Sequence, residues 1–271
     1  MVEQRYIHGF SKQEQDRLLK QGEFVEPYVY EKIDFSHCHR ILEIGCGVGA
    51  QIAVLARRFP RLIIHGMDKE ESQINRAKQV LKDYVDNKRV SLNLANAEAL
   101  PFPDNYYDGA CIFFVLEHVA NPLALLKEAH RVLKPKGVLY CTEVFNSGFY
   151  IHPHCPAISD YWQAFNQYQI DLGGDPDIGI KLVNLGLQAG FKEITDHPIA
   201  PLLDGRMKKI TKRREFLNYW KSLFLSASER LIDEKRITSA IVSELQKEFA
   251  ALSNARDAIF LYSGRQIRCF K

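Results

Sequence analysis

The sequence predicts an α/β protein whose core is a mainly parallel sheet. Five short apolar runs follow residue 40, amphipathic segments of helical length separate most of them, and a glycine-rich turn comes directly after the first run. The five runs are ILEI, LIIHGM, VSLNL, GACIFFV and VLYCTEV. Strands that alternate with amphipathic helices are typical of βαβ units, in which helices cover both faces of the sheet.

Length and composition exclude several other classes. The chain has 271 residues, of which 46% are hydrophobic and 25% charged, as in an ordinary globular enzyme. Its 36 basic and 33 acidic side chains give a net charge of +3, so no polybasic surface for nucleic acid or membranes is predicted. No apolar stretch reaches the about 18–20 residues of a membrane helix, and MVEQRYIHGF lacks the apolar centre of a signal peptide. We therefore expect a soluble, cytoplasmic protein.

The cysteines and histidines indicate neither a disulfide scaffold nor a metal centre. The six cysteines include no CxxC pair, and several lie inside or beside apolar runs. His152, His154 and Cys155 lie close together in HPHC, but a proline separates the histidines and no carboxylates cluster nearby. We predict no metal site and interpret HPHC as loop structure.

Residues 1–38 are predicted to form an N-terminal helical cap. Ser11 and Glu14 have the spacing of a capping box, in which each side chain binds the other residue's free backbone N–H. A helix should therefore begin after Ser11. Pro27 predicts a kink or break before Tyr28, because proline lacks the N–H that an interior helical residue donates.

Residues 39–145 hold the five runs and the helices that cover them. Segments 51–59 and 70–84 carry apolar residues at helical spacing. A further helix should begin at Asn121-Pro122, because asparagine caps helices well and proline is favoured at the first helical position. We predict that this part of the chain binds the cofactor.

The rest of a single domain, residues 1–271, is predicted to be more irregular. Residues 146–176 mix aromatic and turn-forming residues, which indicates a lid insertion of loops or short helices. In residues 177–271 we expect, in order, a helix over 178–189 ended by Gly190, a strand over 191–199, a helical insertion at about 203–255, and a final strand over 258–269.

The first apolar run passes directly into a glycine-rich turn, LEIGCGVG, at residues 42–49. Glycines allow a sharp turn and the close approach of a ligand, while the following helix N-terminus presents free N–H groups. By itself this pattern also fits an ordinary tight strand-to-helix turn. The ligand contacts that it predicts are Gly45, Cys46, Gly47 and Gly49.

Three polar residues indicate which ligand the turn holds. Glu43 stands before the first glycine, and the spacing G-x-G-x-G differs from the G-x-G-x-x-G of dinucleotide sites. A carboxylate there would repel a pyrophosphate but suits a ligand that carries an ammonium and a sulfonium. Asp68 ends the second run, where it can accept hydrogen bonds from ribose hydroxyls. Asn96 follows the third run, where its amide oxygen can accept from an adenine amino group.

Five motifs occur in one order within residues 40–145. They are ILEIGCGVG, the acidic Asp68, NAEALPFPDNYYD, LEHV and LLKEAHRVLKPKGVLY. Together they resemble the class I S-adenosylmethionine-dependent methyltransferases, in particular the type 11 family typified by enzymes of ubiquinone and menaquinone biosynthesis. The resemblance implies a Rossmann-like, seven-stranded, mainly parallel sheet with helices on both faces and the last strand antiparallel. It also implies S-adenosylmethionine as cofactor, S-adenosylhomocysteine as product and methyl transfer as the reaction.

The resemblance also implies further cofactor contacts. Positions in and beside the motifs add the residues Lys69, Ala97, Glu98, Phe114 and Val115. Tyr6 is added for a different reason: YIHGF precedes the capped helix, so Tyr6 should be held near the cleft when the lid docks. The family often has aspartate where Asn96 stands, and asparagine keeps the acceptor oxygen while it removes a charge.

Methyl transfer from a sulfonium is an in-line displacement, which alignment and the exclusion of water can accelerate without a nucleophilic residue. A base is needed only when the acceptor must lose a proton. The candidates are His118, in LEHV after the fourth run, and Glu143, at the end of the fifth run. The alternatives are that His118 only lines the cleft or caps a helix, and that Glu143 forms an ion pair or a hydrogen bond that holds the next loop.

The acceptor is predicted to be a small molecule that is methylated on O, N or an activated carbon. The N-terminal segment and the lid hold more aromatic residues than a loop needs, which suggests an apolar or aromatic acceptor or a local core. Arg17 and Gln21 share a helix face and either reach the ligand or stay solvated, and Gln73 is predicted to lie at the surface. The basic run 208–214 is interpreted as a solvated helix start.

Other functions remain open at this point. A methyltransferase of protein or tRNA would have an open cleft and a continuous binding surface. An inactive cofactor-binding protein would bind S-adenosylmethionine without turnover, and a nucleotide-dependent dehydrogenase conflicts with Glu43. We expect no membrane or nucleic-acid partner, and either a monomer or a homodimer.

Overall fold

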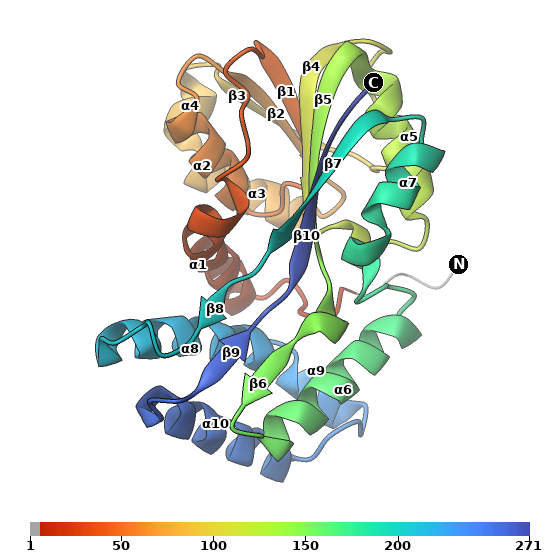
Figure 1. Ribbon diagram of the computed structural model, residues 1–271. Coiled ribbons are helices and arrows are strands. Elements are labelled where there is room, and N and C mark those ends of the chain that lie inside the picture. Colours follow the sequence, from red (N-terminus) through yellow and green to blue (C-terminus); the bar gives the residue numbers. More distant parts are fainter. Residues whose placement is uncertain (1–5) are drawn as a thin grey trace.

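A computed structural model describes residues 6–271 and shows a seven-stranded mixed sheet in the order β3-β2-β1-β4-β5-β10-β7 (Figure 1). Strands β1 to β5 run parallel to one another, and β10 pairs antiparallel with both β5 and β7. The predicted fold class is therefore confirmed. The strands are β1 (Arg40–Ile44), β2 (Ile63–Asp68), β3 (Val90–Leu94), β4 (Tyr107–Phe113), β5 (Leu133–Val144), β7 (Lys192–Ile199) and β10 (Gly264–Phe270).

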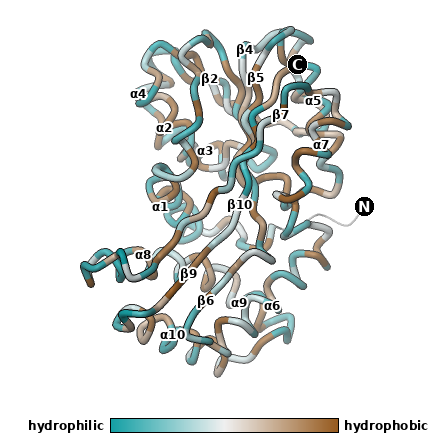
Figure 2. The backbone as a smooth tube through the Cα atoms, viewed as in Figure 1, coloured by the Kyte–Doolittle hydropathy of each residue, from teal (hydrophilic) through white to brown (hydrophobic). Residues whose placement is uncertain are grey.

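Helices cover both faces of this sheet. Side chains alternate along β1, so that Ile41 packs into the core under α1, α2 and α3, while Leu42 packs under α5 and α7. Hydrophobic stretches follow the strands of the sheet (Figure 2). The bounds are α1 (Lys12–Val29), α2 (Ala50–Arg58), α3 (Glu71–Val80), α4 (Lys82–Asp86), α5 (Pro122–Val132) and α7 (Leu182–Gln188), with short 3₁₀ turns at η1 (Leu116–His118), η2 (Asn146–Gly148) and η3 (Ile178–Lys181).

Helix α1 begins as predicted but ends later. The Ser11 Oγ accepts from the Glu14 N–H at 3.2 Å, which confirms the cap. The helix then continues through Pro27 to Val29, so of the predicted kink or break before Tyr28 the break is wrong. Val25 and Val29 on this last part of the helix are buried in the core shared with α2, and this packing outweighs the backbone hydrogen bond that Pro27 cannot form.

A second layer lies below the sheet in Figure 1. It contains α6 (Pro156–Asp171), α8 (Ile210–Leu225), α9 (Ser228–Asp233), α10 (Ser239–Asn254) and a small sheet in the order β6-β9-β8, formed by β6 (Tyr150–His152), β8 (Leu202–Leu203) and β9 (Ile259–Leu261). The sequence predicted loops or short helices in the first insertion, and the sixteen-residue α6 corrects this. Its aromatic residues form one buried face against α8, with Trp162 stacked on Phe224 at 4.6 Å.

The predicted final strand over 258–269 is in fact two strands. Residues of β9 pair with β6 and β8 in the small sheet, whereas β10 pairs with β5 and β7 in the large one. The apolar pattern runs through both strands, so it cannot show that the chain changes sheets at Tyr262. The helical insertion and the helix before Gly190 are present as expected.

All six cysteines are free thiols. Within residues 6–271, none of the helices combines the length and the apolarity that crossing a membrane requires.

Candidate functional site

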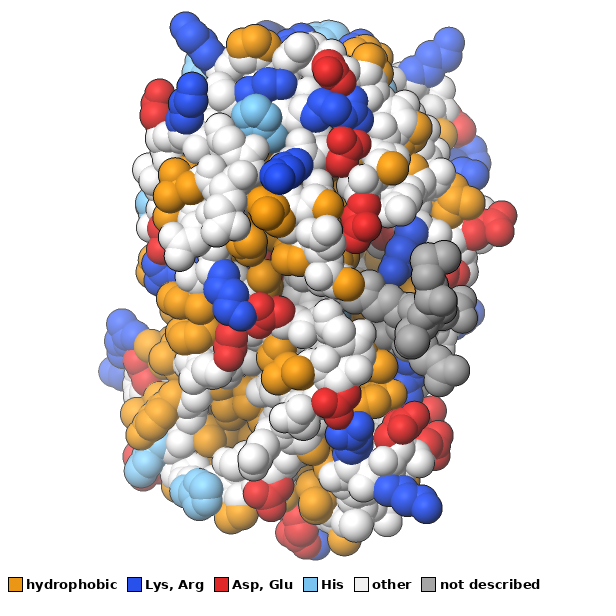
Figure 3. Space-filling view, turned by 90° about the vertical axis from the view of Figure 1, so that its right-hand side faces the viewer, with side chains coloured by type: hydrophobic (Ala, Val, Ile, Leu, Met, Phe, Trp, Pro, Cys, Tyr) orange, Lys and Arg blue, Asp and Glu red, His pale blue; other side chains and the backbone are white. Residues whose placement is uncertain are grey.

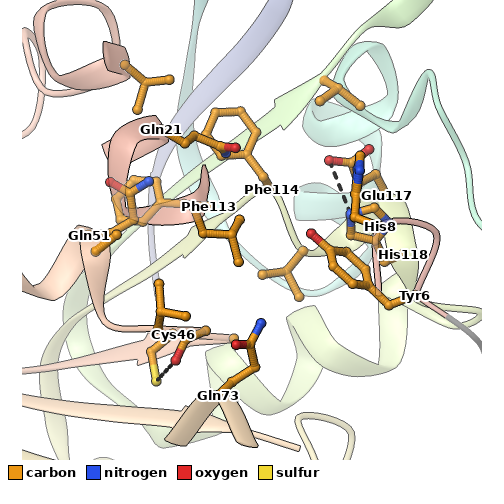
Figure 4. A pocket seen from close by; sticks show the side chains of 18 of the residues that line it. Tyr6, His8, Gln21, Cys46, Gln51, Gln73, Phe113, Phe114, Glu117 and His118 are labelled. Atoms are coloured by element: carbon orange, nitrogen blue, oxygen red, sulfur yellow. Dashed lines mark hydrogen bonds and ion pairs between the residues drawn. The ribbon is translucent and has the colours of Figure 1, made fainter. Parts of the chain in front are cut away.

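A cavity of about 260 Å³ lies where β1, β2 and β4 end, between the large sheet and the aromatic layer below it. Thirteen of the fifteen residues that the sequence proposed for the site line this cavity, and Gly49 and Glu143 do not. Figure 4 shows Cys46, Gln51 and Gln73 on one side of the cavity and Tyr6, Glu117 and His118 on the other. The thirteen are Tyr6, Glu43, Gly45, Cys46, Gly47, Asp68, Lys69, Asn96, Ala97, Glu98, Phe114, Val115 and His118.

The glycine-rich turn is tied to the end of β2. The N–H groups of Gly45 and Cys46 both donate to the Met67 carbonyl at 2.9 Å, and the Gly47 N–H donates to Asp68 Oδ2 at 2.9 Å. Gly45 has φ +76°, and a Cβ there would lie 2.5 Å from the Val115 side chain, so only glycine fits. Beside Gly47 the space is open, which leaves its backbone accessible to a ligand.

Gly49 has a role in packing. It has φ +80°, and a Cβ there would lie 2.6 Å from Leu81 Cδ1. Its backbone forms the N-cap of α2, and its two neighbours, Val48 and Ala50, line the cavity. The third glycine therefore allows α2 to approach the end of α3, and the ligand contact predicted at Gly49 stays a prediction.

Glu43 and Asp68 place two carboxyl groups at the turn. Glu43 is 1% exposed, and its Oε2 atom is buried without a hydrogen-bond partner. Burial and the neighbouring Asp68 raise the pKa of Glu43 well above its usual value. An acceptor held without a donor at a cavity wall fits a ligand that brings donors or a positive charge.

Asp68 is oriented by backbone groups. Its Oδ2 accepts from Gly47 and its Oδ1 accepts from the Glu70 N–H at 3.0 Å. Burial raises its pKa, and these two hydrogen bonds act in the opposite direction. Both oxygens keep a free lone pair, so the carboxylate can also accept from two ligand hydroxyls.

Asn96 forms part of its own loop. Its Oδ1 accepts from the Glu98 N–H at 3.0 Å, an arrangement that shapes the turn in which Ala97 and Glu98 reach the cavity. The side chain is exposed, and its oxygen has one lone pair left. Its predicted contact with adenine stays a prediction.

Glu143 does not face the cavity, contrary to the prediction. The side chain is fully buried, and its Oε1 accepts from the N–H groups of Val115 at 2.9 Å and Leu116 at 2.8 Å. Its Oε2 accepts from the Glu117 N–H at 3.3 Å. Burial and the charge of Glu117 raise the pKa of Glu143 to about 8. Glu143 is thus a positioning residue that holds the loop after β4, which was the alternative interpretation.

The loop that Glu143 holds presents Glu117 and His118 to the cavity. Burial, Lys69 and Arg17 lower the pKa of His118 to about 3, so its imidazole is neutral near pH 7. Its Nε2 lies 3.5 Å from Glu117 Oε1. Sequence reasoning placed Glu117 with His118 at the substrate side but gave no chemical role to this one carboxylate of LEHV.

The N-terminal segment closes one side of the cavity. The Tyr6 ring meets His118 edge-on at 4.8 Å, and the His8 Nδ1 lies 2.6 Å from the Ser226 hydroxyl. The Tyr6 carbonyl accepts from Arg230, whose α9 helix is distant in the sequence. Tyr6 therefore lies in the cavity wall, and contacts with the helical insertion hold it there.

Three polar residues of α1 and α3, Arg17, Gln21 and Gln73, line the cavity. For Arg17 and Gln21 the sequence left open a place at the ligand or in solvent. Arg17 is buried and donates to both Glu14 oxygens at 2.6 and 2.7 Å and to Gln21 Oε1 at 2.8 Å. Gln73, predicted at the surface, is 3% exposed, accepts from Gln15 at 3.1 Å and lines the cavity. Packing of α1 beside the cavity buries Arg17 and Gln73 and leaves Gln21 half-buried, and a helical repeat alone could not show which face of α1 would be covered.

The basic run at the start of α8 is mostly exposed, as interpreted from the sequence. Arg213 is the exception: it is buried and donates to the Ala255 carbonyl, which joins α8 to the end of α10. Among residues 6–271 no group of three or more His, Cys, Asp or Glu side chains could hold a metal ion.

Comparisons with known proteins find likenesses to methyltransferases. Residues 42–141 match a family described as Methyltransferase domain. The chain is 31% identical over 133 residues to methyltransferase GfsG of Streptomyces halstedii, covering 49% of this chain and 48% of the relative. It is 32% identical over 129 residues to a demethylmenaquinone methyltransferase of Listeria welshimeri, covering 47% and 50%. The chain thus spans about half the length of these curated relatives.

Among solved structures, the [4+2]-cyclase SpnF superposes with a TM-score of 0.54 at 20% identity, covering 93% of this chain and 80% of that one. This likeness concerns the fold alone. A cyclase on the same fold illustrates that the side chains of the site, and not the fold, decide the reaction.

Proposed function

We propose, from the membership of residues 42–141 in the type 11 family of class I S-adenosylmethionine-dependent methyltransferases, that this protein transfers the methyl group of S-adenosylmethionine to a small-molecule acceptor. One observation carries the proposal. The cavity brings together Glu43, whose buried Oε2 lacks a partner, the open backbone at Gly47 and the oriented carboxylate of Asp68. These groups suit the amino end and the ribose of this cofactor.

Different residues would bind the different parts of the cofactor. Glu43 would accept from its ammonium group, Asp68 from its ribose hydroxyls and Asn96 from the adenine, with Ala97 and Glu98 beside the ring. Phe114 and Val115 would face its methionine part. When bound, the cofactor supplies an electrophilic methyl group on a sulfonium.

The chain itself would contribute alignment and the exclusion of water. Aromatic side chains from the N-terminal segment, α6 and α8 form the other walls of the cavity, including Tyr6, Phe165 and Trp220. Such walls keep water from the sulfonium and hold an acceptor for in-line attack. The loop that carries His118 is fixed by Glu143, so its groups stay in place during the reaction.

Features of the surface favour a small acceptor over a protein or tRNA. The N-terminal segment covers one side of the cavity. On the face shown in Figure 3, basic and acidic side chains are interspersed and do not form a continuous basic strip. A free cavity of about 260 Å³ also argues against a protein whose lid blocks its own cleft. Location in the cytoplasm and the state of monomer or homodimer stay predictions.

The test is calorimetry of the purified protein with S-adenosylmethionine and, separately, with NAD. We expect binding of the first only. Asp68→Ala should weaken binding by about 1.5–3 kcal/mol, because hydrogen bonds to a charged group are lost. Asp160→Ala, at an exposed position on α6, is the matched control. Unchanged affinity in Asp68→Ala would remove the ribose assignment, and no binding of S-adenosylmethionine by the unmodified protein would remove the proposed function.

A further inference from the structure

Two carboxyl groups of the cavity, Glu70 and Glu117, have no part in the proposed cofactor contacts. Glu70 caps α3, where its Oε1 accepts from the Ser72 N–H and hydroxyl, which leaves Glu117. Glu117 lines the cavity beside His118 and is 8% exposed. Gln169 Nε2 donates to Glu117 Oε2 at 2.8 Å and to its carbonyl at 3.2 Å, while Glu143 accepts from its N–H. Backbone and side chain are thus both fixed, and only one hydrogen bond reaches the carboxyl group from the residues that the structure describes.

This carboxyl group has no cation of its own among the charged groups around it. His118, 3.5 Å away, is neutral near pH 7 because burial lowers its pKa to about 3. The charge of Arg17 lowers the pKa of Glu117, but the Arg17 guanidinium donates its hydrogen bonds to Glu14 and Gln21. Lys69 lowers the pKa of His118, but it follows Asp68 and so lies at the ribose end. Burial therefore raises the pKa of Glu117 to about 7.

Aromatic rings line the part of the cavity that contains Glu117. We call it the acceptor end of the cavity, formed by Tyr6, Glu117, His118, Trp162, Phe165 and Tyr262. Trp162 stacks on Phe165 at 5.3 Å, and Tyr262 lies 6.2 Å from Trp162. Aromatic faces attract cations and exclude water, and a carboxylate between them attracts a positive charge more strongly than it would in water.

We propose that the methyl acceptor is an amine on an apolar or aromatic body, and that Glu117 binds its ammonium form and removes the proton before transfer. The proposal rests on the proposed function and names the acceptor class and a further catalytic residue. It differs from the sequence-based choice of His118 and Glu143, because Glu143 is committed to backbone N–H groups and His118 is too weak a base.

The proton balance is complete without a further reactant. The ammonium R–NH₃⁺ passes one proton to the Glu117 carboxylate and becomes R–NH₂. The nitrogen lone pair then forms the N–C bond to the methyl group as the S–C bond breaks, which leaves R–NH₂⁺–CH₃ and a neutral thioether. Glu117 returns its proton to solvent when the product leaves. An acceptor that carries a phosphate or carboxylate at this end would instead face an uncompensated carboxylate.

A first experiment compares two probes of nearly equal shape, phenethylamine and 2-phenylethanol. Calorimetry at pH 8 with the full chain saturated in S-adenosylhomocysteine should show the amine binding about tenfold or more tightly than the alcohol. Glu117→Gln should abolish this preference, and Glu117→Asp should keep part of it. Glu244→Gln, exposed on α10, is the control and should keep all of it. Equal binding of the probes, tighter binding of the alcohol, or no binding of either would overturn the proposal.

A second experiment separates this proposal from the proposed function. The protein and methyl-labelled S-adenosylmethionine are incubated with small molecules extracted from the cells that make the protein, and products are sorted by cation exchange. We expect label in the retained amines, about 100-fold or more slowly with Glu117→Gln, and a wild-type rate that rises with an apparent pKa near 7.

Each outcome of the labelling is decisive. Label in unretained products would overturn the amine and leave methyl transfer intact. Labelled amines at an unchanged rate and pH profile in Glu117→Gln would remove the role of Glu117. No label in any product, with S-adenosylmethionine bound, would contradict the proposed function and this proposal with it. Thermal unfolding and cofactor affinity of Glu117→Gln, both expected unchanged, exclude misfolding as the cause of a loss.

Discussion

Replacing Glu143 tests whether one buried carboxylate holds the loop of the site. In Glu143→Leu the side chain keeps similar bulk, so little new cavity forms, but three backbone N–H groups lose their acceptor. Two of these hydrogen bonds are short, at 2.9 and 2.8 Å, and the third is longer at 3.3 Å. Val115 precedes η1 and is half-buried, whereas Leu116 and Glu117 lie in η1 and are buried, so that water cannot replace the carboxyl group at their N–H groups.

The size of the effect follows from this count. Each buried N–H left without an acceptor costs about 1–3 kcal/mol, so the two short hydrogen bonds alone amount to about 2–6 kcal/mol of the free energy of unfolding. Removal of a buried carboxyl group relieves part of its desolvation, which places the expected loss in the lower half of that range. Glu143→Gln keeps one acceptor oxygen and should lose about half as much.

Urea unfolding measures these losses, and calorimetry with S-adenosylmethionine measures the effect on the site. We expect both variants to bind the cofactor more weakly, because Val115 and Glu117 shift with the loop. Glu244→Leu, at an exposed position on α10, is the control. If Glu143→Leu loses less than about 1 kcal/mol and binds the cofactor as the unmodified protein does, Glu143 does not hold the loop, and our reasoning on its hydrogen bonds fails.

Two further predictions follow from local geometry and charge. Gly45→Ala should lower the free energy of unfolding by about 1–3 kcal/mol and weaken cofactor binding, because its Cβ meets Val115 at 2.5 Å and φ is +76°; Gly205→Ala, where a Cβ has open space, should do neither. His118, whose pKa falls from 6.5 to about 3 on folding, contributes stability that is complete above pH 6.5 and is lost as the pH falls towards 3. His118→Gln should therefore flatten the acid side of the stability curve in urea titrations from pH 7 to 4, and an equally steep decline would contradict the buried neutral imidazole.

Local sequence patterns predicted the elements that depend on neighbouring residues. Apolar runs marked the strands, Ser11 and Asn121 marked helix starts, and the glycines and Asp68 marked the turn at the end of β1 and β2. These features arise from covalent neighbours, backbone conformation and the alternation of buried side chains, all of which are present in the sequence.

The tertiary structure decided which distant groups meet. Glu143 accepts hydrogen bonds from the loop after β4, and Gln73 is buried beside α1. Nothing near these residues in the sequence indicates either contact. Likewise, the sequence by itself determined that Glu117 stands beside His118. Its burial without a cation follows only from the packing of α6 and the N-terminal segment around it, because the cost of burying a charge depends on every group that surrounds it in space.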